Sequence, residues 1–418
     1  MPRLTEQMDQ STAWLREQQD VATGGWSGAP GDPHLSALNT AEAVIALMQV
    51  EGEIVRDGAV DAGIGYLRSQ QAAHGDDAGA WCRTIEVPDG APVNHPDVVR
   101  TGLALVAFTM AGVPVTDNAV ANALGWLQRV RNADGGWGCT PHERSRILPT
   151  CQVLLGLLAL PAGDPDTDAA IRAGIGFLLE RCRRPGGWFS LTEFPDQLSS
   201  PHTIYAVLVL QAARRAGIQS DIAPERSAID WLLAHQDEAR RLVIEELDSA
   251  PRPHRYTFLY VTDSLLVQVL GSSANAKDRQ ALLYRAALFS VKDRIEPTHG
   301  ACYGFRPFTW STARALAAMS TAAVYEGGFP ERPPETHAAK ARGPLTAVLG
   351  VMLVLGAILG FTGSFSASEF GFFTLLVLAL LLVYGFIGEK TFADLVPSVL
   401  GAKLSAGGAA ADQGAAGQ

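Results

Sequence analysis

The chain has 418 residues, of which 47% are hydrophobic and 18% charged, so it is long enough to bury a large core. Its formal net charge of −10, with no basic run, argues against a nucleic-acid partner. The 5 cysteines are scattered along the sequence, which is not the pattern of a disulfide framework and suits a reducing compartment. Residues 1–21 carry charges throughout and lack the apolar core of a signal peptide.

A short motif recurs along most of the chain. In its clearest copy, Trp126-Leu127 is followed by a polar stretch and then by Gly135-Gly136-Trp137. A leading aromatic returns roughly every fifty to sixty residues, a period typical of stacked helical units. Related copies begin at Trp14, Tyr66 and Phe177, and degenerate ones at Trp231 and Leu288, the last running into Gly300-Ala301-Cys302-Tyr303.

Each motif predicts one polar helix, and the segment after it predicts a more apolar one. We expect the polar helix to start at the aromatic pair and to stop about two turns later at Gly-Gly, because glycine takes the left-handed cap conformation cheaply. The tryptophan after the stop is expected to pack on the neighbouring unit. The apolar helices are expected at Thr40–Val50, Val98–Ala111, Cys151–Leu160, Thr203–Arg215, Asp263–Leu270 and Thr312–Tyr325.

This alternation predicts an all-α fold for residues 1–326. Helices that are apolar on all sides belong inside, and those with charged faces belong outside. Six helix pairs can therefore close into a ring of inner helices wrapped by outer ones, an α/α toroid; an open solenoid is the alternative.

The end of the chain predicts a membrane anchor. Residues 327–343 are expected to be a linker, 344–388 two transmembrane helices, and 389–418 a disordered tail. Lys340, Arg342, Lys390 and Lys403 flank the apolar runs, whereas the connector between them lacks Lys and Arg. The positive-inside rule then places the toroid and both termini in the cytoplasm, with two spans in the cell membrane.

The motif resembles the repeat of terpene cyclases of the squalene-hopene type and of protein prenyltransferase β-subunits. The resemblance covers about residues 5–325 and implies a toroid of six inner and six outer helices around an apolar cavity that holds an isoprenoid chain. It does not by itself fix the function.

The resemblance to cyclases implies an acid motif, Asp-x-Asp-Asp-Thr, at the start of an inner helix, to protonate an alkene. The matching stretch here runs from Asp97 to Thr101. Both of these residues match, but Val99 replaces the aspartate that the family uses as its acid, and Arg100 replaces the next one. Arg100 and Asp97 are expected to form an ion pair, or Asp97 to cap a helix.

The resemblance to prenyltransferases implies a zinc ion held by Asp, Cys and His. His299 and Cys302 match part of that set, and His202 resembles its histidine segment, but Gly300 stands where the family has Asp. We therefore expect no metal and no cofactor. His34, His95, His142, His202, His254 and His299 are expected in loops on one rim of the ring, either as an ion or head-group site or as ordinary polar loop residues.

The candidate site residues follow from these comparisons. Asp97 and Asp263 are the candidate catalytic acids, although Asp263 is also explained as a residue that starts a helix. The candidate cavity residues are Arg100, His202, Tyr205, His299, Cys302, Tyr303 and Trp310.

Three functions are compatible with this sequence. The first is a membrane-tethered toroid that binds an isoprenoid or other long-chain lipid without standard cyclase or zinc chemistry. The second is a divergent terpene cyclase or prenyltransferase that uses another acid, such as Asp97, Asp263 or Glu193. The third is a membrane effector or scaffold, as in bacterial defence, whose toroid docks a protein partner and whose two spans oligomerise; Gly356 and Gly360 have a spacing that packs helices closely.

Overall fold

The computed structural model describes residues 4–51, 58–85, 93–183, 186–188, 198–219, 221–235, 244–247, 254–257, 262–271, 279–302 and 307–326. The chain divides into two units, Met1–Arg332 and Pro333–Gln418, and all described residues belong to the first. The predicted linker, spans and tail, residues 327–418, lie outside the described residues. In the described part of the chain, no helix is long and apolar enough to cross a membrane.

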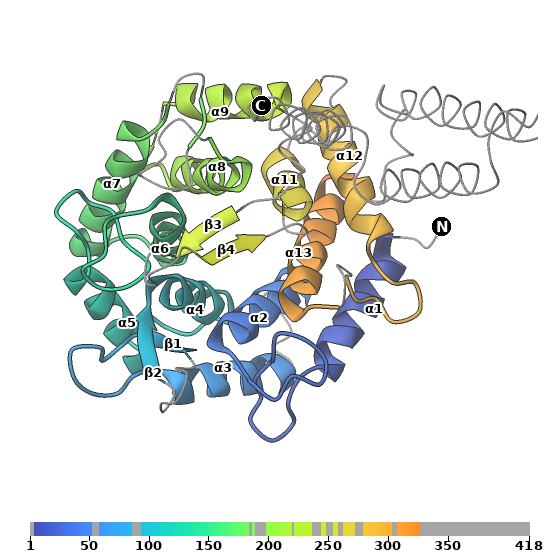
Figure 1. Cartoon of the computed structure of the whole chain (residues 1–418), viewed down its shortest axis with the longest axis horizontal. Helices are drawn as coiled ribbons and strands as arrows, with labels where there is room; N and C mark the ends of the chain where they lie inside the picture. Colours follow the sequence, from blue (N-terminus) through green and yellow to red (C-terminus); the bar gives the residue numbers. More distant parts are fainter. Residues whose placement is uncertain are drawn as a thin grey trace, which may run out of the picture. The chain divides into compact units, whose positions relative to one another are not determined.

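The described helices form two concentric rings (Figure 1). Outer and inner helices alternate along the chain, as the polar and apolar segments of the sequence predict. The outer helices are α1 (Leu4–Glu17), α3 (Gly58–Gln70), α5 (Asn118–Arg129), α7 (Pro165–Glu180), α9 (Ala223–Ala234) and α12 (Arg279–Asp293). The inner helices are α2 (Ala37–Glu51), α4 (Val98–Met110), α6 (Ile147–Ala159), α8 (Ser200–Arg215), α11 (Thr262–Leu270) and α13 (Thr309–Glu326).

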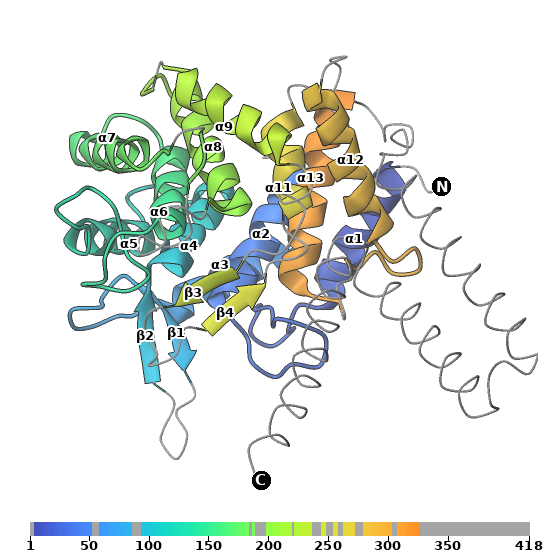
Figure 2. The ribbon, with the colours of Figure 1, turned by 45° about the horizontal axis from the view of Figure 1, so that its top comes forward.

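The inner ring is closed. Each inner helix packs on the next, in the order α2, α4, α6, α8, α11 and α13, and α13 packs back on α2. The first outer helix, α1, packs on α13, so the two ends of the described chain meet (Figures 1 and 2). A hydrogen bond from Ser320 Oγ to the carbonyl of Gln49, 2.7 Å long, joins the last inner helix to the first. The structure therefore has the closed ring and not the open solenoid.

The aromatic pair of each motif ends its outer helix, so the prediction that the helix starts there is wrong. Trp126 and Leu127 lie in the last turn of α5, which ends at Arg129. Phe177 and Leu178 lie in the last turn of α7, which ends at Glu180. The apolar periodicity of each outer helix extends upstream of the pair, where alanines and glycines weaken the signal that marks its start.

The tryptophan of the motif ties four of the outer helices to their inner partners. In the clearest copy, Trp137 Nε1 donates to the carbonyl of Leu127 at 2.8 Å, which satisfies one carbonyl at the end of α5. The backbone N–H of Trp137 donates to the hydroxyl of Thr150 on α6 at 3.0 Å. The same two bonds are made by Trp26 with Leu15 and Thr40, by Trp81 with Leu67 and Thr101, and by Trp188 with Leu178 and Thr203.

The first glycine of the motif is required by the next outer helix. Gly135 has a φ of +86°, and a Cβ there would lie 2.6 Å from the carbonyl oxygen of Ala173 on α7. At the last junction, a Cβ on Gly300 would lie 2.3 Å from the backbone of Gln10 on α1. The tryptophan also reaches the next unit, as predicted, because a Cβ on Gly174 of α7 would lie 3.1 Å from the Trp137 ring.

Two short hairpins correct the all-α prediction. Strands β1 (Trp81–Ile85) and β2 (Val93–Asp97) pair antiparallel with Trp81 opposite Asp97, and they lead into α4. Strands β3 (Ile244–Leu247) and β4 (His254–Thr257) pair with Ile244 opposite Thr257. In Figure 1, β3 and β4 are drawn across the centre of the ring.

Candidate functional site

The threonine bound by each motif fixes the rotation of its inner helix. Within the described residues, Thr40, Thr101, Thr150, Thr203 and Thr312 each accept a backbone N–H from the motif, and we call them the latch threonines. For α13 the donor is Cys302, which stands where the other copies have tryptophan. Because these bonds face the outer ring, residues at the same spacing from each latch threonine point in equivalent directions.

One face of each inner helix looks into the ring. Residues one, three and four positions after a latch threonine are almost completely buried, as Ala41, Ala43 and Val44 show. Residues two before it and two and five after it share a face, because helical neighbours are three and four apart. This lumenal face is less completely buried: Val99, Val106, Leu148 and Leu155 are half-buried, for example.

A contact across the ring confirms the direction of that face. The guanidinium carbon of Arg314 on α13 lies 5.9 Å from the centre of the Tyr205 ring on α8, although α11 separates these helices in the inner ring. Arg314 Nη2 also donates to Glu42 Oε1 on α2 at 2.5 Å. All three residues stand two positions after a latch threonine, so they meet at one level inside the ring.

The lumenal face consists of three levels. The first level is formed by the residues that stand two positions before the latch threonines. It is apolar and consists of Leu38, Val99, Leu148, Pro201 and Trp310. The third level is formed by the residues that stand five positions after the latch threonines. It is also apolar and consists of Ile45, Val106, Leu155, Leu208 and Ala317. The middle level, between these two, is formed by the residues that stand two positions after the latch threonines. It holds Glu42, Leu103, Gln152, Tyr205 and Arg314.

The polar residues of the middle level are Glu42, Gln152, Tyr205 and Arg314, and we call them the polar layer. The side chains of Arg314 and Glu42 are 13% and 9% exposed. Burial raises the pKa of Glu42 above that of a carboxyl in water, and the charge of Arg314 offsets part of the rise. Burial acts to lower the pKa of Arg314, but the Glu42 carboxylate and Tyr205 outweigh it and leave that pKa above its ordinary value.

Asp97 caps α4, as the sequence predicts. Its Oδ1 accepts the backbone N–H of Arg100 at 3.0 Å, and its Oδ2 is paired with the guanidinium of Arg100. The Thr101 hydroxyl donates to the Asp97 carbonyl at 2.8 Å and accepts the Trp81 N–H at 3.1 Å, so Thr101 has a structural role. Val99 stands on the lumenal face between them.

Asp263 lies at the start of α11, where its side chain is 2% exposed. Its Oδ2 is 3.3 Å from Arg294 Nη2, which follows the end of α12. The Cys302 thiol is also nearby: burial raises its pKa to about 12, and the Asp263 charge adds to that rise while Arg294 opposes it. The structure therefore brings Asp263 and Cys302 together near the junction of α11, α12 and α13, at a distance from Asp97 on α4.

The remaining candidates are dispersed. His202 is buried in the first turn of α8, with Nδ1 2.7 Å from Ser199 Oγ. His299 lies in the turn whose Gly300 packs on α1. Trp310 is on the lumenal face, with its ring centre 5.6 Å from that of Phe308. Tyr303 and Glu193 lie outside the described residues.

The predicted set of loop histidines is reproduced in part: His34, His142 and His299 lie in loops or turns, whereas His95 lies in β2, His254 in β4 and His202 in α8. Among the residues that the structure describes, no group of three or more His, Cys, Asp or Glu side chains is placed to hold a metal ion.

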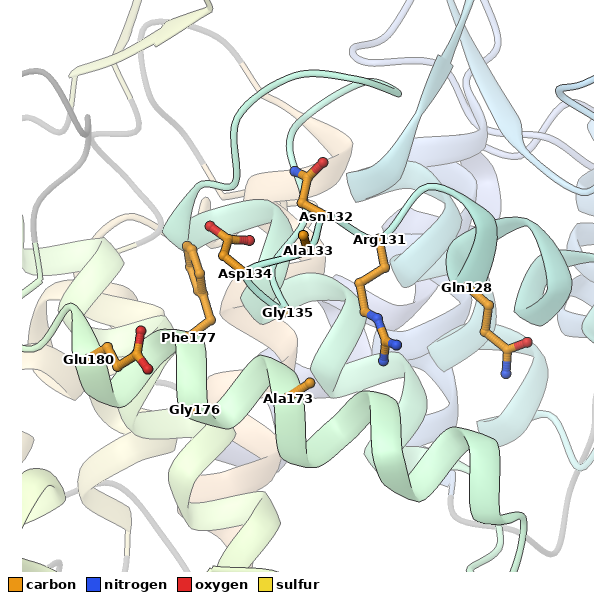
Figure 3. Close-up of a pocket in the computed structure, with 10 residues that line it drawn as sticks. All are labelled: Gln128, Arg131, Asn132, Ala133, Asp134, Gly135, Ala173, Gly176, Phe177 and Glu180. Carbon is orange, nitrogen blue, oxygen red and sulfur yellow. The ribbon is translucent and has the colours of Figure 1, made fainter.

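A pocket of about 470 Å³ opens between the outer helices α5 and α7, away from the lumenal face (Figure 3). Arg131, Asp134 and Glu180 contribute charged side chains to its lining. It lies where the Gly135 turn meets α7, and Asp134 is paired with Arg181 at 3.0 Å. The pocket therefore results from the junction between two consecutive helix pairs of the ring, and its charged lining does not suit an apolar ligand.

Comparison with known proteins agrees with this geometry. The family model of the squalene-hopene cyclase C-terminal domain matches residues 93–208, which run from β2 to α8. A squalene–hopene cyclase of Zymomonas mobilis is 27% identical over 172 residues, which are 38% of this chain and 24% of the relative. A probable squalene–hopene cyclase of Sinorhizobium fredii is 31% identical over 183 residues, 40% of this chain and 26% of the relative. The chain thus matches about a quarter of the length of these relatives.

Solved structures share the whole ring. A variant of the type II terpene cyclase MstE from Scytonema, in complex with geranylgeranyl dihydroxybenzoate, superposes with a TM-score of 0.52 at 14% identity, over 77% of this chain and 98% of that one. The chain is a terpene cyclase-like α/α toroid. A cellobiose 2-epimerase from Spirochaeta thermophila superposes on the toroid with a TM-score of 0.57 at 14% identity, over 77% of this chain and 98% of that one. The likeness therefore shows the fold of the toroid and leaves its chemistry to the site.

Sequence reasoning missed Glu42, Gln152 and Arg314. A signal was present: Glu42 and Arg314 are charged residues within the apolar inner helices, each two positions after a threonine. Only the threonine register shows that they occupy equivalent positions.

Proposed function

We propose that the toroid binds a long-chain apolar molecule of the isoprenoid class along its lumenal face. The observation that carries this proposal is the face itself, in which two levels of apolar side chains from consecutive inner helices line the inside of the ring. Such side chains favour an apolar ligand because they lose water on contact with it. The known ligand of one structural neighbour, geranylgeranyl dihydroxybenzoate, belongs to the same chemical class and supports the proposal.

We further propose that this toroid does not start cyclisation by protonation at the position of the family's acid motif. Val99 occupies the place of the acid on the lumenal face and has no proton to give. Asp97, the remaining carboxylate of that motif, accepts a backbone N–H and pairs with Arg100. Both oxygens of this carboxylate are therefore engaged in capping α4 and in the ion pair, which is a structural role.

Lipid binding is tested by narrowing the lumenal face. Leu155→Trp and Leu208→Trp introduce bulk at the apolar level five residues after the latch threonines. Leu282→Trp introduces the same bulk on the outer helix α12, at a side chain that is 44% exposed. We expect the full chain and the Leu282→Trp variant to retain geranylgeraniol through gel filtration, and the two lumenal variants to lose most of it. Equal retention by all variants, or none by the unaltered chain, contradicts the proposal.

The absence of cyclase chemistry is tested with squalene and geranylgeranyl diphosphate as substrates. We expect no cyclised product by mass spectrometry. A product that disappears in an Asp97→Asn variant would instead show that the toroid is a divergent cyclase with Asp97 as its acid.

We also propose that residues 344–388 anchor the toroid in a membrane as two spans. The length and apolar character of the two runs in the sequence support this. The anchor would tether the toroid to a bilayer that supplies apolar ligands. The full chain is expected to stay in the membrane pellet after carbonate extraction, and its release into the supernatant would contradict the anchor.

A further inference from the structure

The polar layer interrupts an otherwise apolar lumenal face at one level. Glu42, Gln152, Tyr205 and Arg314 come from four different inner helices, and all stand two residues after a latch threonine. The levels on either side of this layer are apolar. Because the positions are equivalent by the helical register, their coincidence at one height is a property of the ring and not of any single helix.

The ion pair in this layer is costly where it stands. The Arg314 and Glu42 side chains are 13% and 9% exposed and pair at 2.5 Å. A buried pair loses hydration that its mutual attraction recovers only in part, and replacing such a pair by apolar residues often stabilises a protein. The pair is not the only contact between these helices in the described chain, since α13 packs on α2 and the Ser320 hydroxyl donates to the Gln49 carbonyl.

The chemistry of the layer selects the polar group of the ligand. Arg314 offers donors only, the Glu42 carboxylate offers acceptors only, and the Gln152 amide offers both. Because the two charges cancel, the layer is neutral. A diphosphate or carboxylate would place an uncompensated charge in it, and a pure hydrocarbon would remove water from the polar groups without replacing its hydrogen bonds.

We propose that the polar layer binds a neutral hydroxyl group of the ligand, so that the toroid takes a long-chain isoprenoid alcohol in preference to the corresponding hydrocarbon, carboxylic acid or diphosphate. This inference rests on the proposed lumenal binding and specifies its ligand class. The hydroxyl donates to Glu42 and accepts from Arg314, and the chain extends along the apolar levels.

The experiment compares four probes on the full chain: geranylgeraniol, geranylgeranoic acid, geranylgeranyl diphosphate and squalene, each competing with tritiated geranylgeraniol. We expect the alcohol to compete at least about tenfold better than the other three. This is about the factor in affinity that one hydrogen bond to a charged group contributes. Equal competition by squalene and the alcohol would overturn the inference while leaving lumenal binding intact. Failure of every probe to bind would instead contradict the proposed function.

Variants of the ion pair test its part directly. Glu42→Gln leaves the Arg314 charge uncompensated, so we expect the ratio of acid to alcohol binding to shift by roughly tenfold towards the acid. The double variant with Glu42→Gln and Arg314→Gln restores a neutral layer and should return the ratio towards that of the unaltered chain. Leu282→Ala on the outer helix α12 is the control. An unchanged ratio in Glu42→Gln would overturn the assignment, and if that variant does not fold, the four-probe comparison still decides.

Discussion

The latch threonines show how one side chain fixes the position of a helix. Each hydroxyl accepts a backbone N–H from the motif. In α4 and α8 it also donates to the carbonyl four residues earlier, at 2.8 Å in both Thr101 and Thr203. The N–H groups concerned are buried, so no water replaces a lost partner. The threonine that matches the last residue of the cyclase acid motif therefore has a structural reason to be present.

Replacing Thr101 tests that reason. Thr101→Val keeps the shape and removes the hydroxyl, which leaves the buried N–H of Trp81 without its acceptor. We expect the free energy of unfolding to fall by about 1–3 kcal/mol. Thr101→Ser keeps the hydroxyl and should cost less, and both are measured by urea unfolding followed by tryptophan fluorescence. If the valine and serine variants are equally stable, the hydroxyl does not fix the helix.

At the same scale, the sequence predicted Asp97 as a cap but not the residues of the polar layer. A cap is a local feature, because its partner lies three residues away. Glu42 and Arg314 lie 272 residues apart and meet only because the ring closes. No spacing within one helix shows that contact.

The outer helices are the elements whose boundaries the sequence located least well. The aromatic pair of each motif is visible in the sequence, but it marks the end of the outer helix. The start of that helix depends on a capping residue further upstream. In α5 that cap is Asp117, whose carboxylate accepts the N–H of Ala119 at 2.9 Å and receives Arg68 of α3 at 2.7 Å. Strand β2 was missed because its Pro96 argues against a strand, whereas here Pro96 stands at the edge of a two-stranded hairpin.

Asp117 gives the junction of α3 and α5 a dependence on pH. The hydrogen bond from Arg68 lowers the pKa of Asp117 below 3.8. The ionised carboxylate is thus favoured in the folded chain, so its contribution to stability is complete above that value and is lost as pH falls through the lower folded pKa. Since Arg68 is 40% exposed, water screens the pair and we expect a contribution below about 1 kcal/mol.

Urea unfolding as a function of pH measures this contribution. Asp117→Asn keeps a capping side chain and removes the charge, so its stability should vary less with pH below 3.8 than that of the unaltered chain. Identical pH profiles for the two proteins would contradict the assignment. Asp117→Ala removes the cap as well and should cost about 1 kcal/mol more at neutral pH.

For the whole molecule, closure of the ring depends on the contact between the last motif and the first helix. Gly300 packs on the backbone of Gln10 and Ser11, and the Ser11 hydroxyl donates to the Gly300 carbonyl at 2.6 Å. The sequence predicted a closed ring from the polarity of its helices. It gave no sign of this contact, because the last copy of the motif lacks its tryptophan.

A pair of glycine variants separates closure from backbone strain. Gly300 and Gly217 have φ of +74° and +71°, but only Gly300 has atoms within 4 Å of the position that a Cβ would take. Both Gly→Ala variants should lose about 1–2 kcal/mol to the left-handed conformation. Gly300→Ala should lose about 1–3 kcal/mol more, because its Cβ pushes α1 away from the ring. Equal losses in urea unfolding would show that this contact does not hold the ring closed.

The repeated tryptophan has a practical consequence for observing this molecule. Trp26, Trp81, Trp137 and Trp188 are each fully buried, and each donates its indole N–H to a carbonyl of its own unit. When all other tryptophans are changed to phenylalanine, the emission of the remaining one therefore reports whether its own helix pair has separated from the ring. In the last copy of the motif, Cys302 stands in place of the tryptophan and is buried, so with the other cysteines replaced its thiol reacts with a probe only after opening. Fluorescence and alkylation together can then follow disassembly around the ring.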